Sequence, residues 1–151
     1  MSANYKQLAK FSDDIKRLND AQKDEFMRAC CKELAARLLR KVIENTKAQT
    51  GTLRRGWTVN THEEAAAGTK VGVKEWCDNV EIKKEGNTYR LNVINPVYYA
   101  PYYEYGHRTS NGAGWVEGRF PLTIAEAELN AVTDAILAKK LQAFMKGVFE
   151  A

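Results

Sequence analysis

The sequence predicts an α+β fold, in which a long N-terminal helix and a C-terminal helix pack on a small antiparallel sheet, with long glycine-rich loops. Three observations lead to this prediction. Apolar residues recur every three or four positions over residues 20–48 and again over residues 122–148, as on the buried face of a helix. Over residues 56–106, apolar and polar residues alternate as they do in strands. Glycines and prolines punctuate the remainder and mark loops.

Length and composition are typical of a single-domain globular protein. Residues 1–151 are enough for one domain with a hydrophobic core. A hydrophobic content of 44% and a charged content of 28% are those of a soluble globular protein and argue against a disordered chain. The net charge of +4 is smaller than the basic excess that nucleic-acid-binding domains usually carry.

The cysteines and the N-terminal segment bear on the compartment. Cys30, Cys31 and Cys77 show no C-x-x-C spacing, so we expect free, buried thiols in a reducing compartment. The segment "MSANYKQLAKF" lacks the apolar core of a signal peptide, and no run of about 18 apolar residues occurs. We therefore expect synthesis in the cytoplasm and no membrane segment.

The N-terminal part of the chain is predicted to be helical. A spacing of three to four between apolar residues predicts a short helical extension over residues 1–19. Asn19 or Asp20 is a suitable N-cap for the long helix over residues 20–48. The apolar stripe of this helix consists of Met27, Cys30, Cys31, Leu34, Leu38, Val42 and Ile43. Gly51 is expected to end the helix, because glycine readily adopts the positive φ of a C-terminal cap.

Residues 56–106 are predicted to form the sheet. Trp57 opens a first strand, and residues 61–72 follow as a glycine-containing connection. The next stretch is typical of a hairpin with "EGN" as its turn. Its alternating apolar residues are Val80, Ile82, Leu91 and Val93. Pro101 and a second proline bar a continuous central strand over residues 98–105, so an edge strand or a broken strand is expected there.

Residues 107–121 and 122–148 complete the predicted organisation. The glycines of "SNGAGWVEG" predict a loop over residues 107–121. Thr123, followed three residues later by Glu126, matches the capping box that begins a helix, and this helix is predicted over residues 122–148. Its acidic residues come early and its lysines late, as the helix dipole favours.

No catalytic or metal-binding motif is found in the sequence. His62 and His107 belong to none of the short zinc-binding patterns, and neither a serine-nucleophile elbow nor a phosphate-binding loop occurs. Glu104 near His107 has the chemistry of an acid–base pair, but a polar surface loop is the simpler interpretation. We therefore predict no catalytic residue, no metal site and no cofactor, and a protein that is not an enzyme.

The basic and aromatic segments are compatible with two kinds of surface. Arg54, Arg55 and Trp57 have the chemistry to grip phosphates and stack on a base. Trp57 also lies on the alternating apolar face of a predicted strand, where core packing is common. The tyrosine-rich segment 98–105 lacks interleaved lysines and contains Glu104, so a protein–protein interface is favoured over a nucleic-acid surface.

Three segments resemble a known family. "NTKAQTGTLRRGWT" is similar to the junction between long helix and first strand in the gp10-like family of tailed-bacteriophage neck and tail-completion proteins, with "KAQ" where a Pro-Val-Asp run is usual. "NPVYYAPYYEYGHRT" and "GWVEGRFPLTIAEAE" resemble the second and third motifs of that family. The matching positions are Thr50, Gly51, Leu53, Arg54, Trp57, Asn95, Tyr99, Ala100, Glu104, Tyr105, Gly106, Trp115, Val116, Gly118 and Arg119.

This resemblance implies a structural virion protein of a phage, prophage or phage-tail-like particle, with a small twisted sheet and no chemistry of its own. Such proteins act at the head-proximal end of the tail, in tail completion or head–tail joining. The implied partners are copies of the chain itself, in a ring such as a hexamer, and tail tube, tail terminator or head–tail connector proteins. The implied location is the tail or neck of the virion, after assembly in the host cytoplasm, with no part played by a membrane.

The candidate interface collects the charged and aromatic residues of these segments. It consists of Arg54, Arg55, Tyr99, Tyr102, Tyr103, Glu104, Tyr105, His107, Arg108, Trp115 and Arg119. We expect the arginines to form ion pairs between subunits with Glu104 or Glu117. The sequence leaves open whether Glu104 contacts a partner or holds the loop that follows it. The alternative function is a small nucleic-acid-binding protein that uses Arg54, Arg55 and the tyrosine-rich segment.

Overall fold

The computed structural model describes residues 13, 16–47, 52–57, 77 and 81–149. The elements in chain order are α2 (Asp20–Asn45), α3 (Thr52–Gly56), β1 (Lys83–Glu85), β2 (Thr88–Arg90), α6 (Ala100–Tyr105), β3 (Gly106–Arg108), β4 (Trp115–Glu117) and α7 (Pro121–Phe149). Most of the predicted extension 1–19, the cap at Gly51, the strand after Trp57, the connection 61–72 and His62 lie outside the described residues.

Helix α2 begins where the sequence predicts. The Asn19 side chain accepts a hydrogen bond from the Gln22 backbone N–H at 2.8 Å, and the Gln22 side chain accepts one from the Asn19 N–H at 3.0 Å. This capping box satisfies N–H groups that the first turn of a helix leaves unpaired. The helix ends at Asn45, earlier than predicted, because Thr46 is extended (φ −87°, ψ 99°) and its hydroxyl donates to the Val42 carbonyl.

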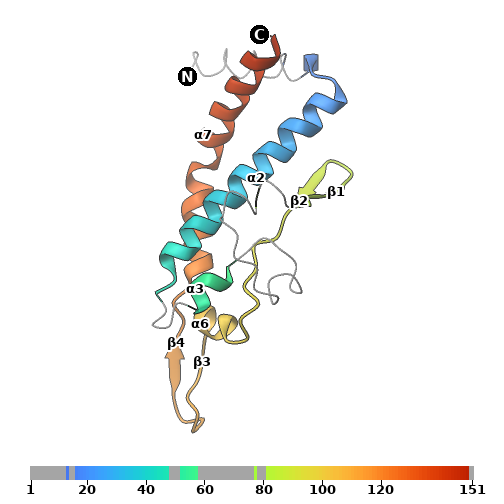
Figure 1. Cartoon of the computed structure of the whole chain (residues 1–151). Helices are drawn as coiled ribbons and strands as arrows, with labels where there is room; N and C mark the ends of the chain where they lie inside the picture. The colour runs from blue at the N-terminus through green and yellow to red at the C-terminus, as the bar shows by residue number, and fades with distance from the viewer. Residues whose placement is uncertain (1–12, 14–15, 48–51, 58–76, 78–80, 150–151) are drawn as a thin grey trace.

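The core lies between α2 and α7, which pass side by side along the molecule (Figure 1). Its buried cluster consists of Ala35, Ala36, Leu39, Val42, Trp57, Cys77 and Ala125. Alanines on both helices allow their backbones to approach closely. Leu39 and Val42 are completely buried, and full burial of such side chains contributes about 1.5–3 kcal/mol each. Farther along the pair, the Phe26 and Phe144 rings lie 5.3 Å apart.

The first hairpin joins β1 to β2 through the predicted turn. The two strands pair antiparallel, and Gly86 in the turn takes a positive φ of 62°, which glycine tolerates without strain. The strands are shorter and more polar than predicted, because the apolar residues lie just outside them. Ile82 is buried, and Leu91 and Val93 pack against the core cluster. Val80 lies outside the described residues.

The strand predicted over residues 98–105 is wrong, because this segment contains helix α6. Pro101 lies in the first turn of α6. A proline is well tolerated there, since its missing N–H would have no partner in the helix and its fixed φ suits the first turn. The proline that argues against a central strand therefore favours the start of a helix.

A second hairpin occupies part of the predicted loop 107–121. Strands β3 and β4 pair antiparallel with Gly106 opposite Glu117, His107 opposite Val116, and Arg108 opposite Trp115. The Thr109 N–H continues the ladder with a bond of 3.0 Å to the Gly114 carbonyl. Both strands are exposed apart from Gly106. Consequently they carry no alternation of buried and exposed residues from which a strand could be predicted.

The α+β class is confirmed, with a correction to the sheet. In the described part of the chain the long helices pack mainly on each other, and the strands form two separate two-stranded sheets. Short helix α3 occupies part of the stretch where the sequence predicts a helix end and the start of a strand. None of the helices among the described residues is long and apolar enough to span a membrane.

Candidate assembly interface

Helices α3 and α6, the β3–β4 hairpin and the start of α7 gather at one end of the helix pair (Figure 1). We call this region the hairpin end. The Asn95 amide links two of its segments, because its nitrogen donates to the Leu53 carbonyl at 2.7 Å and its oxygen accepts from the Val97 N–H at 3.1 Å. The Tyr103 hydroxyl accepts from the Lys47 N–H at 3.0 Å and so ties α6 to the end of α2. The predicted interface residues all lie in the hairpin end.

Glu104 is the buried charged residue of the hairpin end, with 6% of its surface exposed. Its carboxylate accepts hydrogen bonds from the Leu122 N–H at 3.0 Å, the Thr123 N–H at 2.9 Å and the Thr123 hydroxyl at 2.8 Å. The first turn of a helix leaves its N–H groups unpaired and favours a negative charge. Glu104 of α6 is thus the N-terminal cap of α7. The predicted capping box of Thr123 and Glu126 is wrong, because α7 begins at Pro121 and Thr123 lies inside it.

Glycines allow α6 and the chain that enters α7 to come into backbone contact. The Arg119 N–H donates to the Tyr103 carbonyl at 2.8 Å, and the Phe120 N–H donates to the Glu104 carbonyl at 3.2 Å. A Cβ atom on Gly118 would lie 2.2 Å from the Glu104 carbonyl oxygen, which no side chain can occupy. Together these bonds and the Glu104 cap form what we call the latch between α6 and α7.

Trp57 belongs to the core and not to a surface that could stack on a base. It is 6% exposed, and its indole N–H donates to the Thr46 hydroxyl at 2.9 Å. The Thr46 hydroxyl in turn donates to the Val42 carbonyl at 2.6 Å. Leu53, from the same sequence block, is 1% exposed. Part of the "TLRRGW" segment therefore builds the fold, and the part of the nucleic-acid alternative that uses Trp57 is wrong.

Large apolar side chains are exposed across the hairpin end. Tyr102, Tyr105 and Trp115 are each more than half exposed. The Tyr102 ring lies 5.8 Å from the His107 ring, and the Tyr105 ring lies 6.4 Å from the Phe120 ring. The other exposed members are Tyr98, Val116 and Ile124. Concentrations of exposed apolar side chains of this kind mark surfaces that bind other molecules.

The sequence of this chain matches the model of one protein family. The family model described as "Bacteriophage HK97-gp10, putative tail-component" matches residues 9–106, more than half of the chain. The chain belongs to the HK97-gp10-like family. It is accordingly a bacteriophage tail component, as the sequence resemblance predicts. No curated protein and no solved structure matches the chain.

In this HK97-gp10-like chain, the described positions that carry the resemblance include a buried group and an exposed group, and the others are half-buried. Leu53, Trp57, Glu104 and Gly106 are buried. Arg54, Tyr105, Trp115, Val116 and Arg119 are exposed. The first group holds α3, α6 and α7 in place, and the second group is available at the surface of the tail component. Tyr99 and Tyr103 are half-buried, and Arg55, Tyr102, His107 and Arg108 are exposed.

The arginines of the hairpin end are not paired with acidic side chains in the described part of the chain. Arg54, Arg55, Arg108 and Arg119 take part in none of the ion pairs within the described part of the chain. Glu104, one of their two predicted partners, is engaged by α7. Glu117, the other, is exposed on β4. Ion pairs between subunits at this end of the tail component therefore remain a prediction for Glu117.

The hairpin end does not assemble an acid–base pair. His107 Nδ1 lies 2.8 Å from the Arg108 carbonyl oxygen, whereas the Glu104 carboxylate bonds to the first turn of α7. Within the described ranges, no group of three or more His, Cys, Asp or Glu side chains is placed to hold a metal ion. The hairpin end presents aromatic rings, an exposed hairpin and arginines that form no ion pair with the described residues.

Sequence reasoning missed several exposed residues of the hairpin end. Phe120 has a left-handed backbone, φ 51°, which is uncommon for a bulky residue, and no sequence pattern marks it. Ile124 belongs to the apolar repeat from which the helix over residues 122–148 is predicted, but it is 45% exposed. Ala125 and Leu129 define the buried stripe, so the helical phase relative to these residues would have placed Ile124 outside it.

Proposed function

We propose that this tail component acts at the head-proximal end of the tail, in tail completion or head–tail joining. In this proposal it associates with copies of itself as a ring and docks on the tail tube or a connector through the hairpin end. The observation that carries the proposal is the concentration of exposed aromatic side chains and unpaired arginines at one end of a phage tail component.

The chemistry of the hairpin end suits a protein partner. Tyrosine, tryptophan and arginine are enriched in protein–protein interfaces. The aromatic side chains bury much area for little loss of rotamer freedom, and arginine supplies several hydrogen-bond donors. Tyr105 and Trp115 are 64% and 55% exposed, so most of their surface is available for burial by a partner. Strand β4 also presents an outer edge, to which a strand of another chain can pair.

Backbone strain at Phe120 supports the same proposal. The latch holds this residue at φ 51°, with its N–H bonded to Glu104 and its carbonyl bonded to the Ile124 N–H at 3.0 Å. A left-handed conformation at a bulky residue costs about 1–3 kcal/mol and is kept where surrounding structure imposes it. Here it directs an aromatic side chain to the surface beside Tyr105.

The second candidate function is binding of nucleic acid by the hairpin end. The unpaired side chains of Arg54 and Arg55 favour it, together with the exposed ring of Tyr102. Binding of this kind weakens steeply with salt, because arginines release counterions from the phosphates. Titration of the protein with duplex and single-stranded DNA at several salt concentrations tests it. A steep negative slope of log affinity against log salt supports this function, and no binding at low salt excludes it.

Electron microscopy of particles from a producer strain that lacks this gene tests the proposed function. We expect free heads beside tails of faulty length or with unfinished ends, and normal particles when the gene is restored. Labelled protein is expected at the head-proximal end of the tail. Joined, normal particles from the deletion strain contradict the proposal.

A further inference from the structure

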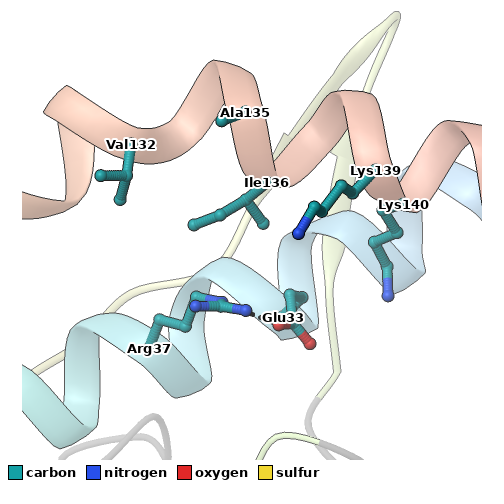
Figure 2. A pocket seen from close by; sticks show the side chains of 7 residues that line it. All are labelled: Glu33, Arg37, Val132, Ala135, Ile136, Lys139 and Lys140. Atoms are coloured by element: carbon teal, nitrogen blue, oxygen red, sulfur yellow. Dashed lines mark hydrogen bonds and ion pairs between the residues drawn. The ribbon is translucent and has the colours of Figure 1, made fainter.

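A groove of about 440 Å³ lies between the middle sections of α2 and α7 (Figure 2). Its lining includes Glu33 and Arg37 of α2, and Val132, Ile136, Lys139 and Lys140 of α7. On α7 the apolar residues come first and the lysine pair follows about one turn later. The groove thus has an apolar section and a basic section along one helix.

The basic section carries positive charge that is not neutralised by an ion pair with any described residue. Arg37 is neutralised by Glu33, whose carboxylate accepts from the Arg37 Nε at 2.8 Å. Lys139 and Lys140 take part in none of the ion pairs in the described ranges of the chain. Val132 remains 44% exposed in the apolar section. A group that fits this groove needs an apolar side chain and, close to it, a negative charge.

Strand β4, in the hairpin end, presents an apolar side chain close to a negative charge. Trp115, Val116 and Glu117 are all exposed, and Glu117 has no ion-pair partner among the described residues. Alternate residues of a strand point to the same face, so Trp115 and Glu117 project together from positions about 7 Å apart. In the groove, Lys139 and Lys140 follow Ile136 along α7 by about 4.5 and 6 Å. The strand and helix spacings differ by about 1–3 Å, which the flexible lysine side chain can span.

The hairpin cannot reach the groove of its own copy. Figure 1 shows the β3–β4 hairpin extending beyond the end of the helix pair, away from the middle sections of α2 and α7 that line the groove. The occupant that fits the groove in apolar character, charge and spacing is therefore the hairpin of a second copy of this chain.

We propose that the β3–β4 hairpin of one copy docks in the groove between α2 and α7 of the next copy. Trp115 then contacts Val132 and Ile136, and Glu117 pairs with Lys139. This inference rests on the proposed function, because it specifies how the tail component associates with itself. Two different surfaces meet in this contact, so it repeats head to tail and forms a ring where the rotation between copies closes.

Cysteine crosslinking in particles tests the contact directly. A variant with both Glu117→Cys and Lys139→Cys is expressed in place of the parent, and purified particles are oxidised and separated without reducing agent. We expect a ladder of covalently linked copies. The chain's own three cysteines form a low background. Burial raises the pKa of the Cys30 and Cys31 thiols and slows their reaction, and Cys77 is buried. The matched control replaces Lys139→Cys by Lys146→Cys, an exposed lysine of α7 outside the groove, and should give monomers.

The outcomes separate the contact from the proposed function. Particles that contain the protein but yield monomers on oxidation overturn the hairpin–groove contact alone. Particles made with the parent chain that lack the protein altogether overturn the proposed function and this contact with it. A ladder of equal intensity in the control also overturns the contact, since it would show linkage that does not depend on the groove.

Exchange of the two charges provides a second test. Glu117→Lys or Lys139→Glu alone places like charges together, and each should lower the yield of infective particles by at least about tenfold. The double variant restores an opposite pair and should recover most of that loss. Lys146→Glu is the control and should match the parent. A double variant that is no better than the worse single variant overturns the contact, provided that all variants unfold at the parent's temperature.

Discussion

At the level of single residues, Glu104 places a carboxylate at the N-terminus of α7 with hydrogen bonds to two backbone N–H groups and one hydroxyl. Hydrogen bonds to an ionised group are stronger than those between neutral groups, and the helix dipole adds to them. Gly118 permits the close approach that brings α6 to this position. Both residues carry the sequence resemblance and both act inside the chain.

Replacement of Glu104 by alanine removes the acceptor for the first turn of α7. We expect the free energy of unfolding to fall by about 2 kcal/mol, because the N–H groups of Leu122 and Thr123 lose their partner. Glu104→Gln keeps one acceptor oxygen and should lower the free energy of unfolding by a smaller amount. Denaturant unfolding of the three proteins measures both differences. Equal stability of Glu104→Ala and the parent would contradict the capping role.

Gly118→Ala tests the close approach in the latch. The added Cβ atom would meet the Glu104 carbonyl oxygen at 2.2 Å, and relief of this clash should cost about 1–3 kcal/mol. Gly147→Ala is the matched control, because nothing lies within 4 Å of its Cβ position in α7. There alanine should stabilise the helix by about 0.5–1 kcal/mol. Thermal unfolding should therefore shift in opposite directions for the two variants.

At the level of elements, an ionic cluster fastens the β1–β2 hairpin to α2. The Asp24 carboxylate accepts from the Tyr89 hydroxyl at 2.7 Å and from the Arg28 Nε at 2.8 Å, and Lys84 lies 3.4 Å away. The Tyr89 hydrogen bond, with help from Arg28, lowers the pKa of Asp24 from 3.8 to about 2. These bonds stabilise the ionised carboxylate and so favour the docked hairpin.

Stability contributed by Asp24 should therefore depend on pH. Because the folded-state pKa is below the unfolded value of 3.8, the contribution is fully present above about pH 4 and is lost as the pH falls toward 2. Tyr89→Phe removes the main cause of the shift. The free energy of unfolding of the parent and of Tyr89→Phe is measured from pH 6 to pH 2. The parent should be more stable at pH 6, and the difference between the two proteins should shrink between about pH 4 and pH 2. An advantage that does not change with pH would exclude the carboxylate as its source.

The elements differ in how far the sequence predicts them. Helix α2 has a long apolar stripe and a local cap at Asn19, so both its existence and its start follow from the sequence. Helix α6 does not follow from the sequence. Pro101 argues against a strand, but it is also compatible with the first turn of a helix, so the proline alone does not distinguish the two. The β3–β4 hairpin has exposed strands without alternation, and the cap of α7 comes from a residue in another element. Local patterns carry no signal for either feature.

The candidate site also contains features that the sequence predicts and features that only the fold reveals. Tyr102, Tyr105 and Trp115 are exposed at the hairpin end, where the sequence predicts an interface. Glu104 and Trp57 have residue types that also occur at functional surfaces, and only their burial distinguishes them. Burial depends on contacts between segments far apart in the chain. Residue type and spacing therefore predict a candidate interface region, whereas the exposure of each residue within it depends on the fold.

At the level of the whole molecule, the residues that stabilise the fold differ from the residues proposed for contact. The buried cluster lies mainly between α2 and α7, whereas the exposed aromatic side chains lie at the hairpin end. Changes at exposed positions away from caps and cores usually alter stability by about 0.5 kcal/mol or less. We therefore expect variants at exposed positions of the hairpin end to keep the fold even where they weaken the proposed assembly.

Trp115→Ala tests this separation. We expect its free energy of unfolding to differ from the parent by less than about 1 kcal/mol, since Trp115 is 55% exposed. Its incorporation into particles should fall by about tenfold or more, because buried tryptophans dominate the energy of interfaces. Met27→Ala, at a position 39% exposed on α2 and distant from the hairpin end, is the control. Normal incorporation of Trp115→Ala would remove Trp115 from the interface.

The packing of α2 on α7 also determines when a newly synthesised chain can complete its fold. These helices are separated in sequence by the whole β region, so α2 leaves the ribosome well before the helix that covers it. At a synthesis rate of about 5–20 residues per second, α7 is completed roughly ten seconds after α2. During that time the apolar stripe of α2 is open to chaperones and proteases. A chain that ends before α7 has no groove between α2 and α7, and its Glu104 has no helix to cap. In the proposed contact, such a chain therefore cannot receive the hairpin of the next copy.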